Sequence, residues 1–125
     1  MPCKTDDGSI ADDAGLLRRI HPSHVVDDHN FGERRASSAA FKDPKLSVDA
    51  EPILAEDGLD WSFTLEGYEG YSLARFLAGV AREKNLSVVH DPIRPDNRAH
   101  TLVVGKKTPA IAHHLRDRAE WVHLD

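Results

Sequence analysis

Apolar side chains between Ser72 and Asn85 recur at the spacing of an α-helix. They fall at positions i, i+3, i+4, i+7 and i+8, which lie on one helical face. Ser72 suits the start of such a helix, and Asn85 suits its end. The pattern therefore predicts a helix over residues 72–85 with these side chains in the core: Leu73, Phe76, Leu77, Val80 and Ala81.

A second helix is predicted from Pro109 to Val122. Thr108 suits its N-cap, and proline is favoured at the first helical position. The expected buried stripe consists of Ile111, Leu115, Ala119 and Val122.

Shorter apolar runs predict strands. Residues 61–65 alternate large apolar and small polar side chains, as a strand with one buried face does. Residues 16–20 fit either a strand or a helical turn, because periodicity cannot distinguish the two over so short a run. A helical turn is expected around residues 51–55. Further strands are predicted over 46–48, 86–90 and 100–104, of which the last two are expected to pair.

Together these elements predict a single α+β domain, in which a small mixed or antiparallel sheet is covered by the helices 72–85 and 109–122. Residues 1–14 are rich in aspartate and are predicted to be a flexible acidic tail, so the domain spans residues 15–125. Residues 21–43 show no sustained period and are predicted to form a long irregular loop. Loops longer than about 12–15 residues are usually functional or disordered.

Composition narrows the function classes. The net charge of −5 argues against broad nucleic-acid binding, which needs a basic surface. No apolar run approaches the roughly 18 residues of a membrane span, and the N-terminus lacks a signal-peptide core. The single cysteine, Cys3, excludes an internal disulfide and fits a reducing compartment. We therefore expect a soluble, cytoplasmic protein.

Histidines and aspartates gather in the predicted 21–43 loop. These side chains carry the donor atoms of a zinc or iron site, but their spacing does not match a helical metal motif. The alternative is a set of solvated loop residues, so no metal or cofactor is predicted. The residues concerned are His21, His24, Asp27, Asp28 and His29.

The turn after residues 100–104 suggests an anion site. Lys106 and Lys107 precede a predicted helix start, where free amides and lysines attract anions. The segment is not a Walker A loop, because His100 stands where the first glycine would be. A plain surface turn before a capped helix is the alternative.

Further candidate residues come from outside this turn. Arg34 and Arg35, with Ser37 and Ser38, carry groups that bind phosphate or carboxylate. His100 is the candidate catalytic residue, because it starts a strand that leads to the lysines and is suited to acid–base work.

His90 is expected beside His100 if their strands pair, so the two rings suggest a general acid and a general base. Neither histidine matches the motif of two-histidine phosphoesterases. The alternative is that each is a strand-end histidine bonded to the backbone.

Several spaced motifs stand out along the chain: Arg18-Arg19-Ile20-His21-Pro22, Ser37-Ser38-Ala39-Ala40-Phe41, Leu46-Ser47-Val48, Ala99-His100 and Gly105-Lys106-Lys107-Thr108. With these motifs, about residues 16–124 resemble a family of short uncharacterised bacterial proteins. The resemblance implies a stand-alone bacterial domain and assigns no catalytic residue.

Two functions are consistent with the sequence. The first is a small accessory or protein-interaction module whose partner is another protein, because the chain is short and acidic and lacks a complete catalytic pattern. The second is an enzyme or binder acting on a small phosphate-bearing ligand through the region of Arg34, Ser38, His100 and Lys106.

Overall fold

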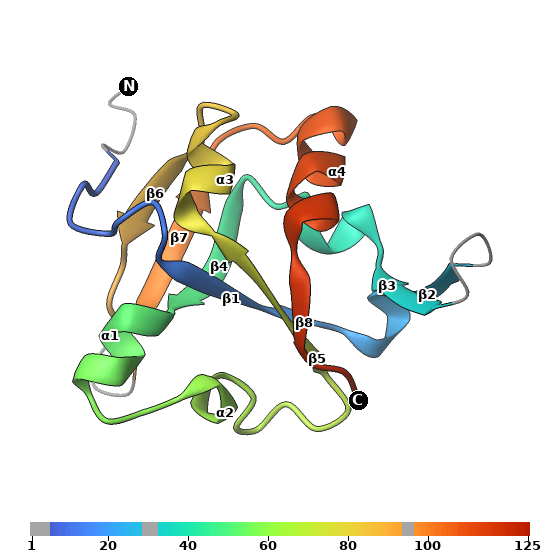
Figure 1. Cartoon of the computed structure of the whole chain (residues 1–125), viewed down its shortest axis with the longest axis horizontal. Helices are drawn as coiled ribbons and strands as arrows, with labels where there is room; N and C mark the ends of the chain where they lie inside the picture. Colours follow the sequence, from blue (N-terminus) through green and yellow to red (C-terminus); the bar gives the residue numbers. More distant parts are fainter. Residues whose placement is uncertain (1–5, 29–32, 94–96) are drawn as a thin grey trace.

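A six-stranded antiparallel sheet forms the centre of the molecule, with the strand order β6-β7-β4-β1-β5-β8 (Figure 1). The computed structural model describes residues 6–28, 33–93 and 97–125. The strands of this sheet are β1 Gly15–Ile20, β4 Lys45–Ala50, β5 Ser72–Leu77, β6 Ser87–His90, β7 His100–Val104 and β8 Glu120–His123.

Short helices and a separate hairpin complete the fold (Figure 1). The hairpin is a second sheet of two strands, β2 Val25–Asp28 and β3 Glu33–Ala36. The helices are α1 Glu51–Glu56, α2 Trp61–Thr64, α3 Ala78–Arg82 and α4 Pro109–Arg118, with the 3-10 turns η1 Pro22–His24 and η2 Ser38–Phe41. No helix among the residues described is long and apolar enough to cross a membrane.

Both faces of the sheet are covered, and each has its own apolar cluster. The larger cluster lies under α3, α4 and η2 and includes Phe41, Phe76 and Leu115. The smaller one lies on the opposite face, where Leu17 and Leu73 pack with residues of α1 and α2. Because successive strand residues point to opposite faces, neighbours along β1 belong to different clusters.

The predicted α+β class, the antiparallel sheet and the pairing of residues 86–90 with 100–104 are confirmed. The strand over 46–48 and the helical turn over 51–55 are confirmed as β4 and α1, and residues 16–20 form a strand. The paired segments 86–90 and 100–104 carry a strong local signal, namely two apolar runs separated by a polar loop.

The predicted helix over 72–85 is wrong in its first half, because residues 72–77 form the strand β5 and only Ala78–Arg82 is helical. The strand is covered on both faces, with Leu73 in the smaller cluster and Phe76 in the larger one. Apolar residues on both faces imitate helical spacing. Leu77, predicted to be buried, is 42% exposed.

The predicted strand over 61–65 is also wrong, since Trp61–Thr64 is the helical turn α2. The Asp60 side chain accepts a hydrogen bond from the Ser62 amide at 2.9 Å and caps this turn. A local cap thus outweighs an alternation of only five residues.

The final helix ends earlier than predicted, at Arg118, and Glu120–His123 forms the edge strand β8. Pairing with β5, where Trp121 lies opposite Ala74, favours the extended conformation. The predicted irregular loop over 21–43 contains η1, the β2–β3 hairpin and η2.

Residues 6–14 make contacts that a flexible tail would lack. Ile10 is 5% exposed and belongs to the larger apolar cluster. The Asp7 amide donates to the Val88 carbonyl of β6 at 2.7 Å, and the Gly79 amide donates to the Asp12 carbonyl at 2.8 Å. How much this segment contributes to stability stays a prediction. Cys3 and His29 lie outside the described residues.

Candidate functional site

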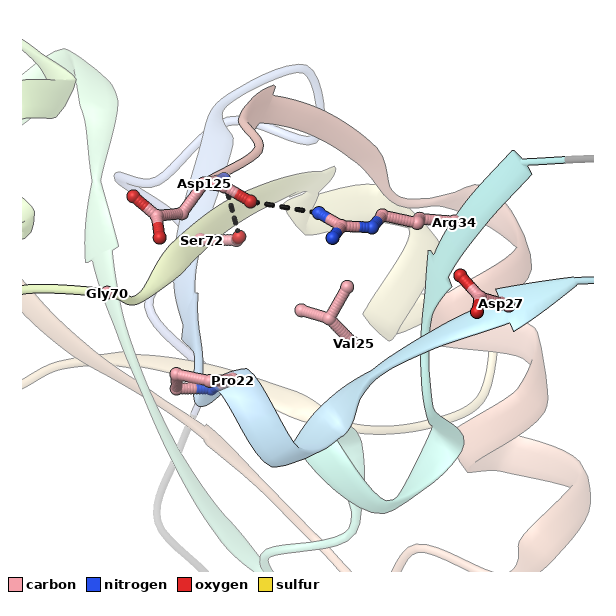
Figure 2. A pocket seen from close by; sticks show the side chains of 7 residues that line it. All are labelled: Pro22, Val25, Asp27, Arg34, Gly70, Ser72 and Asp125. Carbon is pink, nitrogen blue, oxygen red and sulfur yellow. Dashed lines mark hydrogen bonds between the residues drawn. The ribbon is translucent and has the colours of Figure 1, made fainter.

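A pocket of about 320 Å³ lies between the β2–β3 hairpin and the ends of β5 and β8 (Figure 2). Arg34 of β3 reaches across it and donates from Nη1 to the main-chain oxygen of Asp125 at 3.0 Å. The Asp125 amide in turn donates to Ser72 Oγ at 2.9 Å. The pocket is lined by Pro22, Val25, Asp27, Arg34, Gly70, Ser72 and Asp125.

The lining of this Arg34 pocket contains two carboxylates and one guanidinium. Asp27 lies opposite Arg34 in the register of the hairpin, whereas the Asp125 carboxylate points away from Arg34 (Figure 2). An anionic ligand at Arg34 would therefore lie near the Asp27 carboxylate. The charge favours a ligand that brings positive charge of its own.

Two groups of aromatic and imidazole rings come from segments of the chain near this pocket, and most of them are within two residues of a lining residue in the sequence. We call the two groups together the aromatic rim. Trp61 of α2 stacks on His123 of β8, with ring centroids 5.5 Å apart. A second group of rings meets edge to face, and the Arg19 guanidinium lies 4.1 Å from the centre of one of them. The rim consists of His21, His24, Trp61, Tyr68, Tyr71 and His123.

The rim is fixed from beneath by Arg19, a residue of β1. Its Nη1 donates to the Thr64 carbonyl of α2 at 3.1 Å, while its guanidinium covers Tyr68. One cation thus joins α2 to the turn before β5. The sequence signals for this surface are scattered over three segments, so no single motif reveals it.

The other residues predicted to bind an anion lie outside the lining of the Arg34 pocket. Ser37 caps η2, where its Oγ accepts a hydrogen bond from the Ala39 amide at 3.2 Å, and Ser38 is the first residue of that turn. Arg35 follows Arg34 in β3, so its side chain leaves the opposite face of the hairpin. Ser37 therefore has a local structural role.

The two lysines after β7 differ in their surroundings. Lys106 is exposed, whereas Lys107 is half-buried and donates to the carbonyls of Val103 and Gly105, each at 2.9 Å. Burial lowers the pKa of Lys107 to about 8; nearby Asp43 raises it, and Arg18 lowers it further. Lys107 is thus bound to its own backbone at the start of α4.

His100 lies in a buried polar network on the face of the sheet that α2 covers. It is 8% exposed, and its Nδ1 lies 2.9 Å from the Asp91 carbonyl oxygen and 3.2 Å from Asp91 Oδ2. A carbonyl accepts only, so Nδ1 carries the proton and, in the neutral ring, Nε2 keeps its lone pair.

Asp49 of β4 lies opposite His100 in the sheet register. The Ala50 amide donates to the Ala99 carbonyl, which makes this pair a non-hydrogen-bonded one, whose side chains approach most closely. Asp49 is 2% exposed and accepts hydrogen bonds from Thr64 Oγ1 and Asn97 Nδ2, both at 2.8 Å.

The sequence analysis missed this network. The sequence contained one signal for it, an acidic residue between the apolar residues Val48 and Ala50. The carboxylate receives its two partners from α2 and from the segment before β7, which are distant from it along the chain.

The predicted site residues do not converge on one place. His100 begins β7 and Lys106 follows its end, so the strand separates them by roughly 15–20 Å at 3.3 Å per residue. His90 lies opposite Thr101, the neighbour of His100, so the two histidines leave opposite faces of the sheet. Within residues 6–28, 33–93 and 97–125, no group of three His, Cys, Asp or Glu side chains is arranged to hold a metal.

Comparison of the chain with protein-family models, with curated proteins and with solved structures finds no match. The resemblance to short bacterial proteins therefore stays a prediction.

Proposed function

We propose that the protein is an interaction module that docks another protein on the aromatic rim, with the adjacent Arg34 pocket receiving one side chain of the partner. The observation that carries the proposal is the exposure of large rings on this surface, with Trp61 at 36% and Tyr68 at 39%. Leu59 and Leu124, also exposed, flank Trp61 and its stacking partner in the sequence. Exposed apolar groups that gather in one place are typical of binding surfaces.

The composition of the rim supports this function. Tryptophan, tyrosine and arginine dominate the binding energy of protein interfaces, because they combine large apolar area with a polar group. Trp61, Tyr68 and Arg19 supply all three types here.

The rim is also held in place before a partner binds. Trp61 is stacked on His123, and Tyr68 lies between Arg19 and Tyr71. Side chains that are already ordered lose less entropy on association, so their contacts contribute more to affinity.

Charge indicates what kind of side chain enters the pocket. Two acidic residues, Asp27 and Asp125, line it with a single arginine, and the chain as a whole carries a net charge of −5. The exposed rings beside the pocket attract cations through their faces. A lysine or arginine of the partner, flanked by apolar residues, therefore fits this surface best.

The alternative function, binding of a small phosphate-bearing ligand, has one observation in its favour. Arg34 presents a guanidinium at the pocket, and this group suits phosphate. The carboxylate of Asp27 opposite Arg34 weakens this alternative, and neither His100 nor Lys106 lines the pocket. A saturable rise in melting temperature with nucleotides or sugar phosphates that Arg34→Ala removes would favour the alternative.

Site-specific crosslinking tests the docking proposal. A photoreactive phenylalanine analogue replaces Tyr68 in one variant and Ile93 in another, because Ile93 is exposed but lies outside the rim. We expect one defined protein adduct in source-cell extract from position 68 and none of that adduct from position 93. The adduct should disappear when Trp61→Ala is added.

Equal adducts from both positions, or an adduct that persists with Trp61→Ala, would contradict docking on the rim. An adduct between two copies of this chain would show self-association in place of a separate partner.

A further inference from the structure

A second cavity, of about 300 Å³, lies between the N-terminal segment, α1 and the end of β6. This volume is at the lower end of the range of small-molecule sites, roughly 300–1,000 Å³. The cavity shares no lining residue with the Arg34 pocket. It is therefore distinct from the Arg34 pocket.

The floor of this cavity is apolar. It is formed by Ile10 and Ala14 of the N-terminal segment, by Ala50 at the end of β4 and by Ile53 of α1. The first three are buried in the larger apolar cluster, and Ile53 packs against it. A ligand that places an apolar body on this floor removes its own apolar surface from water.

The rim of the cavity is rich in hydrogen-bond acceptors. Asp13 is exposed, and Glu56 has 64% of its side chain exposed. His90 Nε2 lies 2.6 Å from the Arg98 carbonyl oxygen, so it donates there and leaves Nδ1 with a lone pair in the neutral ring. These three groups can accept hydrogen bonds, and two of them are carboxylates.

Arg98 is the cation in the cavity lining, and it is already paired. Its Nη2 donates to Glu56 Oε1 at 2.8 Å and to Asp57 Oδ1 at 3.0 Å. These bonds raise the pKa of Arg98 above its usual value. The positive charge of Arg98 is thus offset by its own partners, and the lining of the cavity as a whole contains more carboxylates than cations.

We propose that this cavity binds a small amphipathic amine, with the apolar body on the floor and the ammonium group against the acceptors of the rim. An ammonium group has three donors and no acceptor, which matches a rim of acceptors. A neutral alcohol has one hydrogen-bond donor and would bind only one of these acceptors, whereas a carboxylate would be repelled by the carboxylates of the cavity.

Nuclear magnetic resonance of the full chain tests this assignment with three matched probes: 2-phenylethylamine, 2-phenylethanol and 3-phenylpropionate. We expect the amine to cause saturable amide shifts in residues 9–14 and 50–56. For a ligand of this size the Kd should be on the order of 1 mM. The alcohol should bind at least threefold more weakly, and the carboxylate most weakly.

Variants separate the two halves of the site. Asp13→Asn should weaken the amine at least threefold and leave the alcohol unchanged, whereas Ile53→Ala should weaken both. Asp117→Asn serves as the charge-matched control, because Asp117 is exposed and outside the cavity lining. The dispersion of the amide signals shows whether each variant is folded.

Three results would overturn the proposal. The first is equal affinity of the three probes, and the second is no saturable shift up to about ten times the expected Kd. The third is a set of shifts confined to residues 61–71 and 121–125, which would place the amine on the aromatic rim.

Discussion

Removing the buried carboxylate of Asp49 should destabilise the protein strongly. Asp49→Ala leaves two hydrogen-bond donors without their acceptor, namely the hydroxyl of Thr64 and the side-chain amide of Asn97. A buried donor left unsatisfied costs about 1–3 kcal/mol. Thr64 is 2% exposed, so the loss of its acceptor should cost the full penalty of about 1–3 kcal/mol. Asn97 is half-buried, so its side-chain amide can donate to water instead.

We therefore expect a loss of about 2–4 kcal/mol in the free energy of unfolding. At about 3–4 °C per kcal/mol for a domain of this size, the melting temperature should fall by roughly 6–16 °C. Urea unfolding followed by circular dichroism measures the free energy directly. Asp117→Ala is the control, with an expected change of less than about 0.5 kcal/mol because Asp117 is exposed and its ion pair is with the adjacent residue, Arg116.

A double-mutant cycle with Thr64→Val tests the cause. If the orphaned hydroxyl is responsible, the double variant should be more stable than the sum of the single losses predicts, by about 1 kcal/mol. An Asp49→Ala variant within about 0.5 kcal/mol of the wild type would refute the reasoning.

Three further predictions concern other parts of the structure. Leu77→Asp should be tolerated because Leu77 is 42% exposed, whereas Phe76→Ala should cost about 3–5 kcal/mol; equal losses in thermal melts would contradict the strand β5. Deleting residues 1–13 should lower the melting temperature by several degrees, because burying an isoleucine such as Ile10 contributes about 1.5–3 kcal/mol; an unchanged value would support a flexible tail. Competitive acylation of the lysines over a range of pH should give Lys107 a pKa of about 8. The free-energy cost of holding its charge in the folded protein is fully present below pH 8 and should disappear as the pH rises to 10.5. Equal labelling of Lys107 and the exposed Lys106 at every pH would contradict the lowered pKa of Lys107.

The parts of the fold that the sequence predicted are those with strong local signals. The β6–β7 pair consists of two apolar runs separated by a polar loop, and α4 begins with a threonine cap and Pro109. The strands β5 and β8 were missed because their conformation depends on pairing with each other and with β1. Sequence periodicity does not contain this long-range information.

In the candidate site, too, single residues could be predicted from the sequence, whereas contacts between distant segments could not. Arg34 was predicted from its residue type to bind an anion, and the structure places it in the lining of a pocket. That it binds a ligand stays a prediction. The aromatic rim was not found, because residues 21–24, 61–71 and 123 meet only in the folded chain. The Asp49 network depends likewise on contacts between distant segments.

The affinity of the crosslinked partner for three forms of the protein tests the central claim most directly. Isothermal titration should compare the wild type, the double variant Trp61→Ala/Tyr68→Ala and the control Ile93→Ala. Losing one hot-spot residue costs about 2 kcal/mol or more, which is about 30-fold in affinity, and such losses are not additive. The double variant should therefore bind at least about 30-fold more weakly. The control should match the wild type, and all three forms should melt within a few degrees of one another. Equal affinities of the wild type and the double variant would contradict docking on the aromatic rim.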